Sequence, residues 1–192
     1  HMSDLLGFSN KELLFSLRYH QGSAIGLFQS AFRPAPPSTL EAKDFIHLNT
    51  ALGIARPYLK QALEAGKVGV NILVYGPPGT GKSQLTRLLA KELQAELYEI
   101  ACTDKSGDPI DRHERLCALR SAMCVLSQQR SLLLLDEIED LFNDGSELSM
   151  FLGGQERQKG WINRMLEENP TPCFWLTNNI NALDNAYIRR FD

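Results

Sequence analysis

The stretch Gly76-Pro77-Pro78-Gly79-Thr80-Gly81-Lys82-Ser83 decides how the rest of the sequence is interpreted. The apolar run before it, Val70 to Tyr75, is rich in β-branched residues and is typical of a strand covered on both faces. The run after it, Gln84 to Leu93, has leucines at helical spacing. A glycine-rich loop between a strand and a helix can surround a polyphosphate with backbone N–H groups. The stretch therefore predicts a phosphate-binding loop.

The side chains of this loop suit a nucleotide bound together with a divalent cation. The pattern GxxxxGK[ST] places Lys82, whose charge can reach the β and γ phosphates, beside Ser83, whose hydroxyl can ligate Mg²⁺. We therefore predict ATP and Mg²⁺ as cofactors. The residues expected to contact the nucleotide are Gly76, Pro77, Pro78, Gly79, Thr80, Gly81, Lys82, Ser83 and Gln84.

Two acidic residues follow a second buried strand, and they indicate that the bound ATP is hydrolysed. Leu132 to Leu135 is continuously apolar, and Asp136 and Glu137 come directly after it. In an open parallel sheet, ligands bind at this carboxyl edge. We expect Asp136 to hold Mg²⁺ through its water shell, and Glu137 to orient and deprotonate the attacking water. The alternative is a plain acidic cap after a strand, and the nearby Glu139 and Asp140 are interpreted as solvated or helix-capping.

Strands and helices alternate along the remaining chain. Further strands are expected at Glu96 to Cys102 and Phe174 to Thr177, with helices starting at Asp108-Pro109 and covering Gln158 to Glu168. Leu40 to Ala65 reads as mostly helical, with a break near Arg56-Pro57. This order predicts an α/β fold with a doubly wound parallel sheet flanked by helices.

The N-terminal part differs in pattern from the rest of the chain. Ser9 and Glu12 fit a capping box that opens a short helix, and the prolines of Arg33 to Ser38 favour an extended linker. We therefore expect residues 3–38 to form a helical extension with a linker, and residues 39–192 to form the main domain.

Composition narrows the class of protein. The 192 residues are 43% hydrophobic and 22% charged, which suits one principal globular domain. The net charge of −3 makes nucleic acid an unlikely partner. The four cysteines form no CxxC pair, so no zinc site is expected. No apolar run is long enough for a membrane span and no signal pattern is present, so we expect a cytoplasmic protein.

At this point the motifs resemble those of the AAA+ ATPases. GPPGTGKS, LLLLDE and the later CFWLTNN are similar to that family's Walker A, Walker B and sensor 1 elements, in the family's order. The resemblance covers about residues 44–192, the large nucleotide-binding subdomain. It implies a P-loop NTPase fold of the AAA+ type, with the family's helical lid lying outside this chain. Without the lid, we expect this chain to have weak nucleotide affinity and little turnover alone.

The resemblance also implies further site residues. Asn178 matches the sensor 1 position, whose amide contacts the γ-phosphate or the attacking water. The closing segment, Leu183 to Asp192, resembles the one that carries arginine fingers, so Arg189 and Arg190 are both candidates. A weaker match places Ile46 and His47 in the adenine pocket.

The resemblance implies ATP hydrolysis that drives remodelling of a protein or protein complex. It also implies that the subunits self-associate into a ring, a hexamer in this family. A departure from the family is the absence of an aromatic residue in Cys102 to Gly107, which argues against threading a polypeptide through the ring. Two alternatives stay open at this point: an ATP-dependent nucleic-acid loader or initiator, and a nucleotide switch or scaffold that does not hydrolyse ATP.

Overall fold

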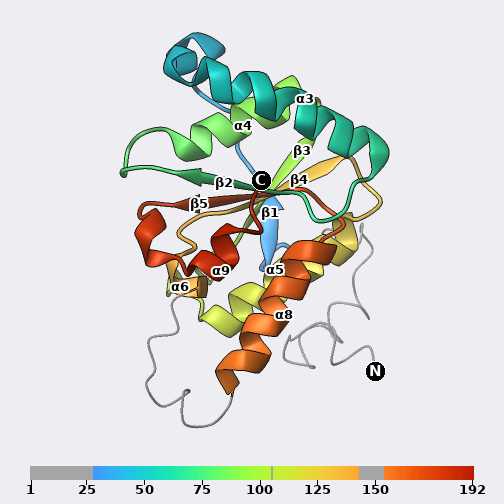
Figure 1. Cartoon of the computed structure of the whole chain (residues 1–192), viewed down its shortest axis with the longest axis vertical. Coiled ribbons are helices and arrows are strands. Elements are labelled where there is room, and N and C mark those ends of the chain that lie inside the picture. Colours follow the sequence, from blue (N-terminus) through green and yellow to red (C-terminus); the bar gives the residue numbers. More distant parts are fainter. Residues whose placement is uncertain (1–27, 105, 143–153) are drawn as a thin grey trace.

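The computed structural model describes residues 28–104, 106–142 and 154–192. It contains one sheet in the order β1-β3-β4-β5-β2, with helices on both faces (Figure 1). The expected N-terminal helix at Ser9 lies outside the described residues.

Four parallel strands form the main part of the sheet. They are β2 (Asn71–Tyr75), β3 (Glu96–Ile100), β4 (Ser131–Leu135) and β5 (Cys173–Thr177). The connecting helices are α4 (Lys82–Glu92), α5 (Arg112–Leu126) and α8 (Gly154–Glu168). The doubly wound α/β fold expected from the sequence is therefore confirmed.

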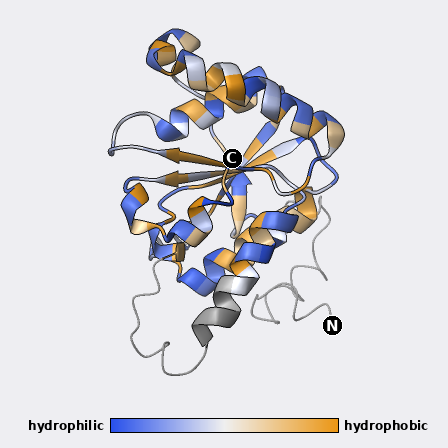
Figure 2. Ribbon diagram, in the orientation of Figure 1, coloured by the Kyte–Doolittle hydropathy of each residue, from blue (hydrophilic) through white to orange (hydrophobic). Residues whose placement is uncertain are grey.

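Alternation along the strands divides the core into two layers. In β4 all five residues are buried. Leu132 and Leu134 face α4 and α3 (Asn49–Ala65), while Leu133 and Leu135 face α5 and α8. The strands appear as a hydrophobic centre between amphipathic helices in Figure 2. Each buried leucine stabilises the fold by roughly 1.5–3 kcal/mol, so β4 contributes to both layers of the core.

An edge strand lies in a segment that the sequence analysis treated as an extension and linker. β1 (Phe32–Pro34) pairs antiparallel with β3, and the Phe32 side chain is only 1% exposed. Proline is tolerated here because an edge strand has one side without a ladder. The sheet is therefore mixed, and part of the expected extension belongs to it.

Two expected helix boundaries are wrong. The helix α3 continues through Pro57, and the irregular backbone lies earlier, at Phe45 in the 3₁₀ segment η2 (Ala42–Leu48). Burial of Leu52 and Leu59 on either side of Pro57 offsets its steric cost of about 3 kcal/mol.

The second wrong boundary is the start of α5. This helix begins at Arg112, with Asp111 as its N-cap, rather than at Asp108-Pro109. The Asp111 carboxylate accepts a hydrogen bond from the Glu114 N–H at 2.8 Å. Pro109 instead lies in an isolated bridge with Thr103. Both Asp108-Pro109 and Asp111 carry helix-start signals, and the later one has the cap hydrogen bond.

A buried asparagine joins the start of β2 to its neighbours. Asn71 is fully buried, and its Nδ2 donates to the carbonyls of Leu166 (2.7 Å) and Gly69 (3.1 Å). Its Oδ1 accepts from Asn169 Nδ2 at 2.8 Å and Trp175 Nε1 at 3.0 Å. A buried amide with every polar atom bonded fixes β2 against β5 and the end of α8.

The same point anchors the C-terminal segment, which contains η3 (Ile180–Ala182) and α9 (Asn185–Ile188). Asp192 donates its N–H to the Asn71 carbonyl at 2.7 Å, and its carboxylate accepts the Asn71 N–H at 2.9 Å. Phe191 packs against Trp175. In the described part of the chain, no helix has the length and apolar character needed to cross a membrane.

Candidate functional site

The phosphate-binding loop lies between the end of β2 and the start of α4. Gly79 and Gly81 have φ of 77° and 82°, a left-handed conformation that glycine adopts without strain. Among the described residues, no hydrogen-bond partner is found for the backbone N–H groups from Gly79 to Gln84. Unpaired N–H groups at a glycine-rich helix start are what a polyphosphate requires. The loop therefore fits the predicted ligand.

Lys82 connects the loop to the neighbouring strand. Its Nζ donates to the carbonyls of Gly76 at 2.8 Å and Pro77 at 3.1 Å. It also donates to Asn178 Oδ1 at 2.8 Å, directly after β5. The structure therefore brings together two of the site residues expected from the sequence, 96 positions apart.

Ser83 and Asp136 form the second contact across the site. The Ser83 Oγ donates to Asp136 Oδ2 at 2.9 Å, and the other carboxylate oxygen accepts the Glu137 N–H at 2.9 Å. A hydroxyl and a carboxylate at this separation suit Mg²⁺, which binds through few protein oxygens and keeps several waters. The expected metal ligands therefore fit the cation.

Glu137 has an unusual backbone for a residue with a side chain. Its φ is 51°, and its side chain is exposed at the carboxyl edge of the sheet. A left-handed non-glycine residue costs on the order of 1–3 kcal/mol and is found most often at functional sites. The next residue, Ile138, donates its N–H to the Leu176 carbonyl of β5 at 3.1 Å. The turn at Glu137 is therefore bonded to the neighbouring strand directly after it.

Glu139 is a site residue that the sequence analysis missed. It opens α6 (Glu139–Phe142), and its Oε1 accepts hydrogen bonds from Thr177 Oγ1 at 2.7 Å and from the N–H groups of Asn178 at 2.6 Å and Asn179 at 3.2 Å. Burial by itself would raise the pKa of Glu139, but the hydrogen bonds from Thr177 and the backbone outweigh it and hold the pKa below its usual value. Glu139 is therefore neither simply solvated nor simply a cap, because it fixes the turn that carries Asn178.

A cavity of about 190 Å³ adjoins the loop where an adenine is expected. His47 lines it together with Phe45, Leu48 and Tyr75. The other residue expected there, Ile46, is 63% exposed and is not among the lining residues. Tyr75 was not singled out from the sequence, although its place directly before Gly76 was a usable signal.

Gln84 is turned toward the segment before η2. Its Oε1 accepts from the Thr39 N–H at 2.9 Å and from Ser38 Oγ at 3.2 Å. The structure therefore places this side chain against the N-terminal connection, while its backbone N–H remains part of the loop.

The two candidate arginines differ in their surroundings. Arg190 Nε lies 2.9 Å from Glu167 Oε1, and its Nη1 donates to the Ala186 carbonyl at 2.6 Å. The Arg189 side chain is exposed and has no interaction with a described residue. The structure thus pairs Arg190 with residues of the same chain and leaves Arg189 exposed to solvent.

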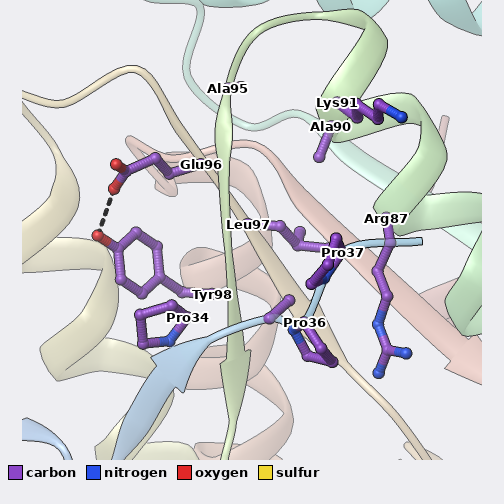
Figure 3. Close-up of a pocket in the computed structure, with 11 residues that line it drawn as sticks. Pro34, Pro36, Pro37, Arg87, Ala90, Lys91, Ala95, Glu96, Leu97 and Tyr98 are labelled. Carbon is purple, nitrogen blue, oxygen red and sulfur yellow. Dashed lines mark hydrogen bonds between the residues drawn. The ribbon is translucent and has the colours of Figure 1, made fainter. Parts of the chain in front are cut away.

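A larger cavity of about 440 Å³ lies at the start of β3, away from these residues (Figure 3). Pro34, Pro36 and Pro37 form one of its walls, and α4 forms another. Tyr98 and Glu96 are also among its lining residues; Tyr98 donates to Glu96 at 2.6 Å, and burial together with this bond raises the pKa of Tyr98 to about 12. None of the site residues expected from the sequence lines it.

A known protein family matches the part of the chain that carries these residues. The family described as "ATPase family associated with various cellular activities (AAA)" matches residues 72–192. This chain belongs to that family. The match includes the loop, the acidic pair, Asn178 and both arginines.

Individual relatives are similar over most of this chain. Fidgetin-like protein 1 of Caenorhabditis briggsae is 28% identical over 155 residues, which cover 78% of this chain and 26% of the relative. Spastin of Drosophila persimilis is 29% identical over 161 residues, covering 78% and 19%. The chain therefore spans about a fifth to a quarter of the length of these curated relatives.

Solved structures share the fold. The FIGL-1 AAA domain in complex with ADP superposes with a TM-score of 0.55 at 19% identity, covering 97% of this chain and 61% of that one. PCH-2 of C. elegans gives a TM-score of 0.51 at 18% identity, covering 84% and 47%. The AAA+ form of the P-loop α/β fold is thereby established for this chain.

Proposed function

We propose that this chain binds Mg-ATP and, once assembled with neighbouring subunits, hydrolyses it. The observation that carries the proposal is the meeting of Lys82, Ser83, Asp136 and Asn178 at one edge of the sheet, beside a loop whose N–H groups are unpaired. A plain glycine turn would need neither the lysine nor the carboxylate at these distances.

The residues divide the chemistry among them. Bound Mg-ATP supplies the phosphoryl group and the charge that the site must stabilise. Lys82, now bonded to carbonyls of its own loop, would exchange them for phosphate oxygens, and Ser83 with Asp136 would hold Mg²⁺. Glu137 would accept a proton from the attacking water, and Asn178 would orient that water.

The adenine is proposed to enter the 190 Å³ cavity beside the loop. Phe45 and Leu48 provide apolar surface there, while His47 and Tyr75 provide rings with polar edges. Aromatic and apolar walls with few polar groups are typical of a base-binding pocket. This proposal keeps His47 and leaves Ile46 outside.

Arg189 is proposed to act on the site of a neighbouring subunit. Arg190 is held by Glu167 and Ala186 in its own subunit, so its charge is committed there. Arg189 is exposed and therefore available to a γ-phosphate across an interface. Hydrolysis would then depend on assembly, with a hexameric ring as the proposed form.

Remodelling of a protein or protein complex is the proposed use of this energy. The similarity to Fidgetin-like protein 1 and to spastin supports this use. The ADP bound in the FIGL-1 structure supports an adenine nucleotide as the ligand. A cytoplasmic location is part of the same proposal.

The test uses two inactive variants of the protein under conditions in which its subunits assemble. Glu137→Gln should bind ATP without turnover, and Arg189→Ala should do the same. Mixing the two should restore hydrolysis, because one interface then combines an intact Glu137 with an intact Arg189 from its neighbour. Full activity in the Glu137→Gln variant would remove the proposed role of Glu137, and no recovery on mixing would remove Arg189 as the arginine acting in trans.

A further inference from the structure

A buried arginine lies behind the acidic pair. Arg115, in the first turn of α5, is 4% exposed. Its Nη2 donates to the Asp136 carbonyl at 2.6 Å, and its Nη1 donates to the Glu137 carbonyl at 3.2 Å. One guanidinium therefore holds the backbone carbonyls of both acidic residues, while the Glu137 side chain itself is exposed.

Stability alone does not explain this arginine. Within the described residues Arg115 forms no salt bridge, and its buried Nε has no hydrogen-bond partner. Burying a cation without an opposite charge is unfavourable, and an apolar side chain of similar volume often packs as well or better. The groups that Arg115 bonds, the carbonyls of Asp136 and Glu137, therefore indicate its role.

Arg115 donates to the carbonyls of two consecutive residues, and this restricts the backbone conformation between them. In an extended chain, successive carbonyls point to opposite sides, so one guanidinium cannot reach both. They point the same way only when the backbone between them curls. The left-handed φ of 51° at Glu137 supplies that curl, at a cost on the order of 1–3 kcal/mol.

Arg115 also connects neighbouring strands. Its Nη2 lies 3.6 Å from Cys102 Sγ, just after β3, while the two carbonyls follow β4. The guanidinium thus fixes the turn after β4 relative to the end of β3 and the first turn of α5.

We propose that Arg115 is a positioning residue that keeps Glu137 in its left-handed conformation and so aims its carboxylate at the site. This inference rests on the proposed function, since it takes Glu137 as the residue that activates water. Without the two hydrogen bonds, the backbone of Glu137 relaxes to a negative φ, and the carboxylate leaves the position from which it acts.

The conformational part of the proposal is tested on this chain by NMR. The variants are Arg115→Met, which keeps volume and removes the donors, and Arg115→Lys, which keeps the charge but loses the fork of two donors. Arg120→Lys, on the same helix, is the matched control. The readout is the intraresidue NOE between the Glu137 amide proton and Hα, which is strong only for a positive φ.

We expect this NOE to be strong in the wild type and in Arg120→Lys and to weaken in both Arg115 variants, with thermal unfolding still cooperative. A strong NOE in Arg115→Met would overturn the proposal, because the backbone would then hold its conformation without the arginine. The apolar variant keeps the test usable if Arg115→Lys fails to fold.

The catalytic part of the proposal is tested by ATPase kinetics under conditions in which the subunits assemble. Arg115→Lys should lower kcat by about tenfold or more, which is part of the roughly 10²–10⁴-fold that a positioned base contributes, with KM changed less than about threefold. Combined with Glu137→Gln it should cause no further loss, since both changes remove one function. Unchanged kcat with an inactive Glu137→Gln would overturn the positioning role. If Glu137→Gln itself were fully active, the proposed function would fail, and the NMR result would still decide whether Arg115 sets the backbone.

Discussion

Lys82 Nζ donates a hydrogen bond to Asn178 Oδ1 at 2.8 Å and so joins the phosphate-binding loop to the end of β5. The loop follows β2, and β2 and β5 are neighbours in the sheet, with Tyr75 opposite Thr177. The contact therefore exists because parallel strands end at the same edge. It places a cation and an amide side by side next to the glycine-rich loop.

Removing the Asp136 charge should weaken binding only when metal is present. Asp136→Asn keeps an acceptor for Ser83 but loses the charge that attracts Mg²⁺. We expect about tenfold or more weaker binding of ATPγS with Mg²⁺, which corresponds to roughly 1.4 kcal/mol or more, and no change in EDTA. Fluorescence titration with a labelled nucleotide measures both conditions. Asp140→Asn, three residues beyond the pair, is the control, and equal losses with and without metal would contradict the metal role.

Glu139 should contribute stability that depends on pH. Its pKa is lowered in the folded state, so its contribution is complete above the unfolded value of about 4.3 and is lost as pH falls through the lower folded value. Glu139→Ala should therefore lower the free energy of unfolding by roughly 1–3 kcal/mol at neutral pH.

Urea unfolding at neutral pH and near pH 3 checks this behaviour, because the difference between wild type and variant should shrink in acid. Glu168→Ala is a suitable control, since that side chain forms only an exposed pair with Arg164. A difference that stays constant across this range would show that the carboxylate charge contributes nothing.

Asn71 should be among the costliest positions to change. Asn71→Ala would leave Trp175 Nε1 without its acceptor in the core and would leave Asn169 Nδ2 with only the Val70 carbonyl, and an unsatisfied buried group costs about 1–3 kcal/mol. We expect a loss of roughly 2–5 kcal/mol in the free energy of unfolding, measured by urea denaturation with circular dichroism. Asn181→Ala, at an exposed position, should change it by less than about 0.5 kcal/mol.

The parts of the fold that were predicted correctly depend on local pattern. The continuous leucines of β4 and the helical spacing of α4 are signals carried by adjacent residues, and the loop between β2 and α4 is a sequence motif. The parallel order of the four main strands followed from their alternation with helices.

The features that were missed depend on contacts between distant segments. Phe32 was assigned to the N-terminal extension, just before the expected linker, because nothing nearby reveals that Ile100 lies opposite it. Glu139 looked solvated, because its partners follow a strand about forty residues away. Asp108 and Asp111 both carry capping signals, and only the folded chain decides between them. The different surroundings of the two arginines likewise arise from Glu167, a residue of α8.

The central claim is that the loop from Gly76 to Ser83 binds the phosphates of ATP through Lys82. The most direct test is calorimetric titration of ATPγS with Mg²⁺ into this chain, into Lys82→Ala and into Lys91→Ala, an exposed lysine on the same helix. We predict binding by the wild type and by Lys91→Ala, and binding weakened by about tenfold to a hundredfold in Lys82→Ala, as expected for a lost contact between charges. Equal affinity in all three proteins would contradict the account.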